Sequence, residues 1–499
     1  MIQPVLELKR LTKTFGTLKA CDSIDLTLFP GEILALLGEN GSGKTTLMNM
    51  ITGLYRPDNG AIFVRGRRED VHAPSDSRRL GIGMIHQHFK LVEPFTAQEN
   101  ILLGFPRRRG QSSAKLREDI QALSARYGLD VKLDQRVHNM SVSQKQTVEI
   151  LKVLYRGADI LILDEPTAVL TPQETDRLFD ILRRMRDSGS AIIMITHKLS
   201  EVMALSDRIA ILRQGRHIAT VRRDETSPSQ LTEFMVGQKI DLNIARPSTL
   251  QKPLLSIKNL TVRDSDGAQR LSGVSFDLAA GEILGVAGVA GSGQKQLCEA
   301  IAGLVPTASG AILLHGRNLA GQSPRQIYEQ GVRLGFIPED RLGMGLVGSM
   351  NIVDNLLLRD YRRQHGPFLR RSGARVRADD LVKRLAIIPP EPLRPVGRLS
   401  GGNLQKVLLG RELMSKPELL VTSYVVRGLD IQSSYVIYDL LNEQKRSGVG
   451  ALFVGEDLDV LLELCDRIMV LCGGRVTGIA DARTATREQI GLLMVGGAL

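Results

Sequence analysis

The stretch Gly38-Glu39-Asn40-Gly41-Ser42-Gly43-Lys44-Thr45-Thr46 fits the pattern G-x-x-x-x-G-K-[ST] of a phosphate-binding loop. It follows the apolar run 33–37, which is typical of a buried parallel strand, and precedes the helix-like run 47–54. Glycines let the backbone curl so that its N–H groups face the phosphates of a nucleotide. Lys44 adds a positive charge, and the Thr45 hydroxyl suits Mg2+. The sequence therefore predicts a nucleotide-phosphate site over residues 38–46.

The composition is that of a globular chain with several domains. The 499 residues are 43% hydrophobic and carry a formal charge of +11. We expect no membrane span and no signal peptide, because no apolar run approaches the roughly 18 residues that a span needs. Four cysteines without C-x-x-C spacing predict free thiols in a reducing cytosol. The basic charge suits nucleic acid or an anionic surface, but the short arginine runs lack interleaved aromatics, so we expect no nucleic-acid partner.

The chain contains one unit twice. Gly31-Glu32-Ile33-Leu34 recurs at 281–284, and Met235-Val236-Gly237 recurs at 494–496. The number of residues that separates corresponding positions of the two copies grows from 250 at Gly38 to 259 at Met235. This growth predicts a loop insertion of about nine residues in the second copy. We predict domains over 1–240 and 254–499, joined by a polar linker over 241–253. Each half alternates apolar strands with helical stretches, which predicts an α/β fold with a mostly parallel sheet.

Further candidate residues follow the strands of the first half. Asp164 and Glu165 end the apolar run 160–163, and such a pair suits ordering of Mg2+ through water by Asp164 and activation of the attacking water by Glu165. Gln87 ends another strand and suits a sensor of Mg2+ or of the water. His197 closes the strand 191–196 and suits a γ-phosphate contact.

Several alternatives remain open at this level. Phe15 is either an adenine platform or a core residue. His86 and His88 share a strand face, but two histidines without a third ligand do not predict a metal site. Ser141 or Ser143 caps the helix that follows, and residues from about 100 to 139 look like an inserted basic helical lobe.

Together these motifs resemble the ATP-binding subunits of ABC transporters over essentially the whole chain. The order aromatic loop, phosphate loop, Gln loop, signature helix, acidic strand end and His loop is specific to that family, and two such halves resemble the ATPases of importers for ribose-type sugars and nucleosides. Thr167-Ala168-Val169-Leu170-Thr171-Pro172 and Pro338-Glu339-Asp340-Arg341 favour the nucleoside-type members. The resemblance implies two tandem ATPase domains, each with an inserted helical lobe, packed head to tail. Each ATP site would then combine one half's phosphate loop with the other half's signature.

The two implied composite sites differ in completeness. Site one joins the first phosphate loop, with Thr45, Gln87 and Asp164 as Mg2+ residues and Glu165 and His197 as catalytic residues, to Ser400, Gly401, Gly402 and Asp430 of the second half. Site two is degenerate, since Gln294 and Lys295 replace the lysine and the hydroxyl residue. Ser423 and Tyr424 replace the acids, Glu456 replaces the histidine, and Glu339 replaces the glutamine. We expect site two to be hydrolytically dead, and the sequence leaves open whether it binds nucleotide.

The resemblance implies that ATP hydrolysis with Mg2+ powers uptake of a simple sugar or nucleoside. It implies a peripheral location at the cytoplasmic face of the membrane. The partners of the chain would be a permease and, through the permease, an extracytoplasmic solute-binding protein. The competing interpretation is an ABC ATPase that acts on the ribosome or on nucleic acid, since such proteins also fuse two halves. Those proteins usually have a long charged helical linker and two complete sites, which this sequence lacks.

Overall fold

The computed structural model describes residues 3–87, 89–105, 112–239, 244–247, 252–264, 266–361, 364 and 368–497. The chain divides into two compact units, Met1–Asp241 and Leu242–Leu499. Most of the predicted linker lies outside the described residues. Its last two residues, Lys252 and Pro253, begin strand β11 (Lys252–Arg263), so the second unit's first strand starts before the predicted boundary.

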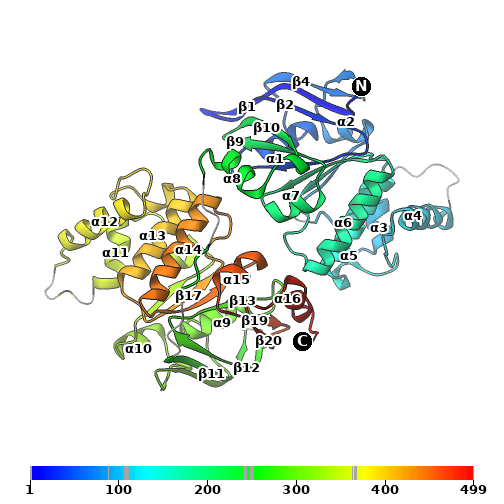
Figure 1. Cartoon of the computed structure of the whole chain (residues 1–499). Coiled ribbons are helices and arrows are strands. Elements are labelled where there is room, and N and C mark those ends of the chain that lie inside the picture. The colour runs from blue at the N-terminus through cyan, green and yellow to red at the C-terminus, as the bar shows by residue number, and fades with distance from the viewer. Residues whose placement is uncertain are drawn as a thin grey trace. The chain divides into compact units, whose positions relative to one another are not determined.

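The first unit contains two sheets (Figure 1). The six-stranded sheet has the order β10-β9-β3-β8-β7-β6, and all its neighbours are parallel except β9 and β10. Its strands are β3 (Ile33–Leu37), β6 (Ile82–Ile85), β7 (Ile160–Asp164), β8 (Ala191–Thr196), β9 (Arg208–Arg213) and β10 (Arg216–Arg222). The mostly parallel α/β sheet that the sequence predicted is therefore confirmed.

A second, antiparallel sheet in this unit was not predicted. It has the order β2-β1-β4-β5 and comprises β1 (Leu6–Phe15), β2 (Leu18–Leu28), β4 (Asn59–Val64) and β5 (Arg67–Glu69). Leu34 and Leu36 of β3 pack in the core beneath this sheet, whereas Ile33 packs in the core on the opposite face of β3. Because both faces of β3 are covered, its sequence is a continuous apolar run.

The helices of the first unit surround the parallel sheet. They are α1 (Lys44–Ile51), α2 (Pro74–Arg79), α3 (Ala97–Leu102), α4 (Ser113–Tyr127), α5 (Val142–Tyr155), α6 (Pro172–Asp187), α7 (Leu199–Leu205) and α8 (Pro228–Val236). The predicted lobe over 100–139 corresponds to α3, α4 and the 3-10 turn Val137–Asn139, and α5 packs against α3 and α4. Ser141 caps α5 by accepting a hydrogen bond from Gln144 N, which decides between the two predicted caps.

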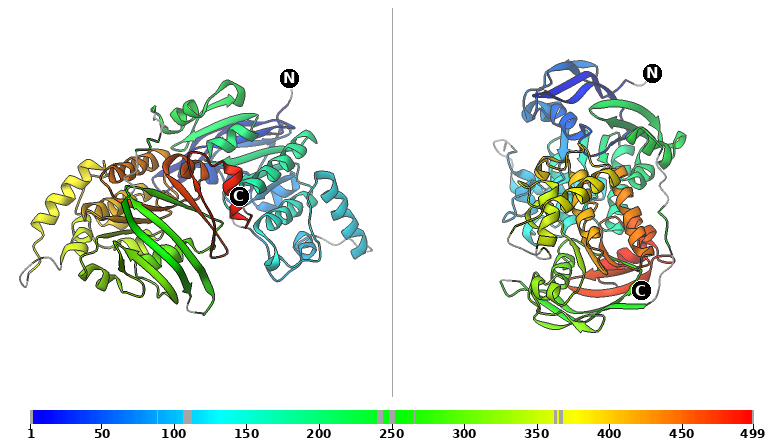
Figure 2. Two further views of the ribbon diagram at one scale, coloured as in Figure 1. Left: turned by 60° about the horizontal axis from the view of Figure 1, so that its bottom comes forward. Right: turned by 90° about the vertical axis from the view of Figure 1, so that its left-hand side faces the viewer.

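The second unit repeats this architecture strand for strand. Its parallel sheet has the order β16-β17-β18-β13-β19-β20, and its antiparallel sheet has the order β12-β11-β14-β15, in which β11 and β12 form a long pair (Figure 2). The remaining strands are β12 (Gln269–Ala280), β13 (Ile283–Ala287), β14 (Ser309–Leu314), β15 (Arg317–Asn318), β16 (Leu334–Ile337), β17 (Leu419–Ser423), β18 (Gly450–Val454), β19 (Arg467–Cys472) and β20 (Arg475–Asp481).

The second unit's helices locate the insertion. They are α9 (Gln294–Ile301), α10 (Pro324–Glu329), α11 (Ile352–Asp360), α12 (Ser372–Arg384), α13 (Gly401–Met414), α14 (Ile431–Arg446), α15 (Leu458–Leu464) and α16 (Arg487–Met494). The offset between the copies is 252 at the starts of β6 and β16 but 259 at the starts of α4 and α12. Most of the extra residues therefore lie between β16 and α12, where the second unit has a short π-helical turn, η3 (Arg341–Gly345).

Candidate functional site

The phosphate loop joins β3 to the first turn of α1. Gly43 has a φ of 100° and is the N-cap residue of α1, so Lys44 is the first helical residue. Lys44 is only 7% exposed, and its Nζ donates to the carbonyl oxygens of Gly38 (2.7 Å) and Glu39 (2.8 Å). The loop thus curls around its own lysine. This arrangement holds an ammonium group and the N-terminus of a helix at one anion site.

Two glycines of the loop have no room for a side chain. A Cβ at Gly38 would lie 2.4 Å from the Leu212 carbonyl oxygen, and one at Gly43 would lie 2.3 Å from the Ala20 carbonyl oxygen. The backbone of this loop therefore packs directly against the strands beside it. Around these glycines, Asn40, Gly41 and Thr45 are exposed, Glu39 and Thr46 are half-buried, and Ser42 is buried.

Glu165 lies between two hydrogen-bond donors. Its Oε1 accepts from Nδ1 of His197 at 2.9 Å, and its Oε2 accepts from Nε2 of Gln87 at 2.9 Å. The three residues follow the carboxyl ends of β8, β7 and β6, which are adjacent in the sheet. The structure thus brings together three of the predicted site residues, because parallel strands end at one edge.

The charges of this site act on one another. The hydrogen bond from His197 holds the pKa of Glu165 below its ordinary value. Burial raises the pKa of Asp164, and the neighbouring charge of Glu165 raises it further. Burial lowers the pKa of Lys44, while Glu165 and Asp164 oppose that effect. Glu165 is therefore held in its charged, unprotonated form.

The residues assigned to Mg2+ fit a hard cation. Asp164 is a carboxylate whose charge is disfavoured by burial and by Glu165, and the Thr45 hydroxyl belongs to the first turn of α1. A divalent cation would relieve the repulsion, and Mg2+ prefers few protein oxygen ligands together with water and phosphate. Within the described residues, no three His, Cys, Asp or Glu side chains form a metal cluster. His88 lies outside the described residues, so the pair with His86 is not described.

Phe15 is available as a platform. It is 43% exposed at the end of β1, and its ring meets the Tyr55 ring edge-on with centroids 5.4 Å apart. Lys13 Nζ lies 5.7 Å from the ring centroid. An exposed ring braced by a second aromatic can stack a nucleobase, whereas a core residue would be buried. The structure therefore favours the platform over the core interpretation.

The second unit's signature residues lie at the start of α13. Ser400 caps this helix, and its Oγ accepts from Nδ2 of Asn403 at 2.9 Å. A Cβ at Gly402 would lie 2.8 Å from Ser433 Oγ and 3.2 Å from Asp430 Oδ2. A side chain at position 402 would therefore displace Ser433 or Asp430 of the same unit, a constraint that the sequence did not suggest. Gly401 is exposed, and a Cβ there would approach only Arg341.

The second unit's counterpart of the Glu165 cluster has the opposite polarity. Here a single donor, Arg427, pairs with two carboxylates, Glu339 and Glu456, and the Arg427 Nε–Glu456 Oε1 distance is 3.0 Å. The Arg427 guanidinium lies 5.7 Å from the centroid of the Tyr424 ring. Burial raises the pKa of Tyr424 to about 12, so this phenol cannot serve as a base near neutral pH. The charged groups of this cluster therefore pair with one another. No role for Arg427 was predicted from the sequence.

A buried asparagine in each unit was not predicted from the sequence. Asn100 in α3 is fully buried and bonds to both backbone groups of Val92 and to Thr96 O. Asn355 in α11 is fully buried as well and bonds Val347 in the same way. Asn100 holds the segment that follows Gln87 in the first unit, and Asn355 holds the segment that follows Glu339 in the second. The recurrence of Asn at corresponding places was the available signal.

Comparison with known proteins places these features in a family. Residues 21–168 and 271–422 match the family described as ABC transporter. The chain is 42% identical to the nucleoside import ATP-binding protein NupA of Lactococcus lactis, covering 99% of both chains. It is 39% identical to the glucose import ATP-binding protein TsgD13 of Haloferax volcanii, covering 99% of this chain and 96% of that protein. It is 40% identical to the guanosine import ATP-binding protein NupO of Bacillus subtilis, covering 99% and 97%. Among the described helices, none has the length and apolar character that crossing a bilayer requires.

Proposed function

The chain belongs to the ABC transporter family, and on that premise we propose that it is the ATPase of an importer for a nucleoside or a simple sugar. In this proposal the first unit hydrolyses ATP, and the second unit contributes its signature residues. The relatives' names, which are those of nucleoside and glucose import ATP-binding proteins, support this solute class.

The observation that carries the proposal is the Glu165 cluster. Glu165 accepts hydrogen bonds from Gln87 and His197. The buried ammonium of Lys44 is near enough to help lower the pKa of Glu165. Such a carboxylate accepts the proton of a water molecule that attacks the γ-phosphate, giving ADP and phosphate. Gln87 and His197 fix the direction of the carboxylate. Lys44 and the loop N–H groups hold the phosphates and stabilise the charge that develops on them.

Mg2+ would be held by Thr45 and, through water, by Asp164, with Gln87 at the same strand edge. When bound, it neutralises charge on the β- and γ-phosphates. Phe15 would stack the adenine. Ser400, Gly401, Gly402 and Asp430 would approach the γ-phosphate in the closed state. We place the domain boundaries near residues 240 and 253, with a single competent site.

The partners in this proposal are a membrane permease and, through it, an extracytoplasmic solute-binding protein. The chain would lie at the cytoplasmic face of the membrane. ATP would stabilise the closed arrangement of the two units, and hydrolysis would release it. The switch draws its free energy from the different affinities of ATP and ADP for the closed state.

Glu165→Gln tests the assignment of the base. Because general-base catalysis contributes typically 100- to 10,000-fold, we expect steady-state phosphate release to fall at least about 100-fold while Mg2+-ATP remains bound. Tyr424→Phe alters the corresponding position of the second unit and is the matched control, with turnover expected to stay near wild type. Near-normal turnover of the Glu165→Gln chain would exclude Glu165 as the base.

A further inference from the structure

The first unit contains a buried carboxylate, Glu201, that takes no part in the cluster around Glu165. Glu201 belongs to the first turn of α7 and is only 4% exposed. Its Oε1 accepts a hydrogen bond from the Thr167 hydroxyl, and its Oε2 accepts one from the Thr196 hydroxyl at 3.1 Å. Lys198 Nζ lies 3.1 Å from Oε1 and neutralises the charge. Both oxygens of this buried carboxylate are therefore paired inside the unit.

The hydroxyl partners of Glu201 belong to the two segments that contain the proposed catalytic residues. Thr167 is two residues after Glu165, in the segment that follows β7. Thr196 is the last residue of β8 and directly precedes His197. Glu201 thus joins the two segments through hydrogen bonds to a charged group, which are roughly twice as strong as neutral ones.

This connection fixes the positions of the two segments relative to each other. Glu165 and His197 must stay within hydrogen-bond distance, 2.9 Å in the structure, for the imidazole to orient the carboxylate. Thr167 and Thr196 are only 3% and 2% exposed, so water cannot take over the bonds that their hydroxyls make. The connection through Glu201 is therefore maintained by the protein alone.

The second unit has an apolar pair at the corresponding positions. The starts of β7 and β17 are 259 residues apart, and so are the starts of α7 and α15. Val426 therefore corresponds to Thr167, and Val460 corresponds to Glu201. Both valines are half-buried and pack against the apolar core of their unit. The second unit has thus replaced a charged connection with hydrophobic contacts.

The backbone of these segments does not depend on the carboxylate. Lys198 precedes α7 and Asp457 precedes α15 with the same φ of −87° and ψ of 112°. Glu165 and Tyr424, which follow β7 and β17, have similar φ values of 46° and 51°. Replacing buried charged groups with apolar ones of similar volume is often neutral or stabilising. The fold therefore does not require Glu201, which points to a role in the chemistry of the first unit.

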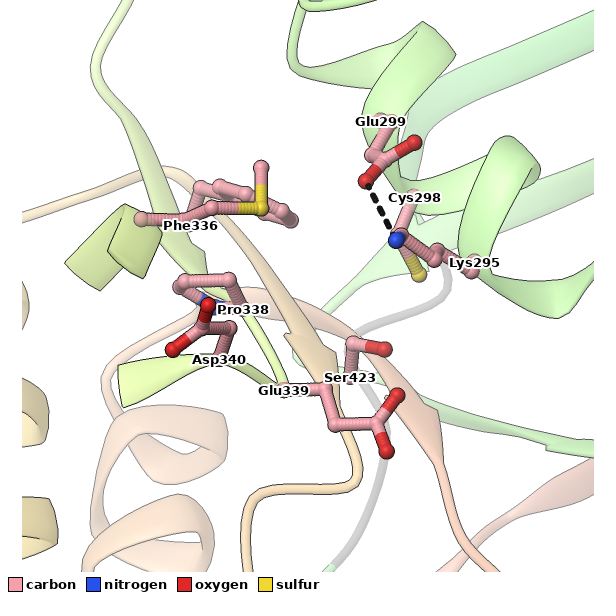
Figure 3. A pocket seen from close by; sticks show the side chains of 9 residues that line it. Lys295, Cys298, Glu299, Phe336, Pro338, Glu339, Asp340 and Ser423 are labelled. Carbon is pink, nitrogen blue, oxygen red and sulfur yellow. Dashed lines mark ion pairs between the residues drawn. The ribbon is translucent and has the colours of Figure 1, made fainter. Parts of the chain in front are cut away.

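The strand ends of the second unit offer no hydrolytic chemistry to position. Figure 3 shows Ser423, the counterpart of Asp164, at a cavity of about 390 Å³. The charged groups among the described lining residues are one ammonium and three carboxylates, those of Lys295, Glu299, Glu339 and Asp340. This net acidic cavity would repel a terminal phosphate. The unit that lacks the charged connection is therefore also the unit that lacks the hydrolytic residues.

We propose that Glu201 is a positioning residue for ATP hydrolysis, which holds the Glu165 and His197 segments together through Thr167 and Thr196. This role rests on the proposed function, in which Glu165 is the base. Glu201 acts only through its neighbours and is not itself a catalytic residue.

The test introduces the valine pair of the second unit into the first. The full chain with Thr167→Val and Glu201→Val should fold, because the second unit forms the same arrangement with valines. A misplacement of about 1 Å can cost about 100-fold in rate, and the remaining bond from Gln87 limits the displacement of Glu165. We therefore expect kcat for phosphate release to fall about tenfold. KM for Mg2+-ATP should stay within about threefold, because the phosphate loop is unchanged.

Two comparisons separate positioning from a merely structural role. In the His197→Ala chain the contact with Glu165 is already absent, so adding the two valines should lower kcat by less than about twofold. Thr167→Ser keeps the hydroxyl and should keep kcat within about twofold of wild type, whereas Thr167→Val should lower it. Val426→Thr is the matched isosteric control in the second unit and should leave kcat unchanged.

A kcat near wild type in the double valine variant would overturn the proposal, and so would an equal loss with and without His197. Circular dichroism on heating verifies that the double variant is folded. If it does not fold, Thr167→Val and Thr167→Ser provide the test, and equal kcat values for these two would overturn the proposal. Near-normal turnover of Glu165→Gln would overturn both the proposed function and this role. Turnover lost in Glu165→Gln but kept in the double variant would overturn the role of Glu201 alone.

Discussion

Removing the His197 imidazole isolates the contribution of one hydrogen bond to the proposed hydrolysis. His197→Ala deletes the bond from Nδ1 to Glu165 Oε1 and leaves the bond from Gln87 to Oε2 in place. A hydrogen bond to a charged group contributes about 1.5–3 kcal/mol, which corresponds to roughly 10- to 150-fold in rate. The His197 side chain is 46% exposed, so water can replace part of the bond. We therefore expect kcat to fall about tenfold.

The same variant should change the pH dependence in a defined direction. The His197 hydrogen bond is the largest cause that lowers the pKa of Glu165. Removing it raises that pKa, so the unprotonated base is lost at a higher pH as the solution is acidified. The acidic limb of the kcat profile should therefore move to higher pH in His197→Ala. His197→Gln, which can still donate, should restore part of both effects.

Phosphate release from saturating Mg2+-ATP, measured across the pH range in which the chain stays folded, provides both quantities. Glu456→Ala changes the corresponding residue of the second unit and should leave kcat and the acidic limb unchanged. An unchanged kcat and acidic limb in His197→Ala would refute the view that this bond orients and acidifies Glu165. A loss as large as that of Glu165→Gln would show instead that His197 contacts the reacting groups directly.

Three further predictions follow from contacts elsewhere. Gly43→Ala should remove ATP binding at the first loop and so lower the nucleotide bound per chain in equilibrium dialysis, because its Cβ would lie 2.3 Å from Ala20 O. Gly41→Ala, with no atom within 4 Å of its Cβ, should weaken that binding less, and equal losses would contradict this. Asn100→Leu leaves buried backbone groups unpaired and should lower the free energy of unfolding by about 2–4 kcal/mol in urea, where an unchanged midpoint would count against it. The difference in ultraviolet titration between wild type and Tyr424→Phe should show that the Tyr424 phenol ionises near pH 12. Any stabilisation that the neutral phenol gives the folded chain is lost as the pH rises above about 10. Ionisation of the Tyr424 phenol near pH 10 would show that this side chain is not buried.

The parallel sheet and the first site could be predicted because their residues are local in sequence. A strand covered on both faces is a continuous apolar run, as in Ile33–Leu37. The residue after such a run lies at the strand's carboxyl end, where parallel strands meet. Gln87, Glu165 and His197 could therefore be placed near one another without knowing the strand order. Their contacts at 2.9 Å follow from β6, β7 and β8 being neighbours.

Other features depend on pairings that no local pattern contains. Glu339 and Arg427 are 88 residues apart and meet only because β16 and β17 are adjacent. The antiparallel sheet was missed because the register of β1 with β2 and β4 shifts at several points, which interrupts the alternation expected of a strand. The packing role of Gly402 depends on Ser433, which belongs to another helix. In each case, tertiary neighbours rather than local sequence decide the outcome.

The inverted polarity of the second cluster explains why its hydrolytic parts are lost together. In the first unit one acceptor, Glu165, lies between two donors. In the second unit one donor, Arg427, lies between two acceptors, Glu339 and Glu456. A glutamate introduced at Tyr424 would add a third carboxylate beside these two, and their repulsion would raise its pKa instead of lowering it. No single substitution at this position can therefore regenerate a charged base. The single charge of Arg427 is shared between the two carboxylates, so the cluster keeps a net negative charge that adds to this repulsion.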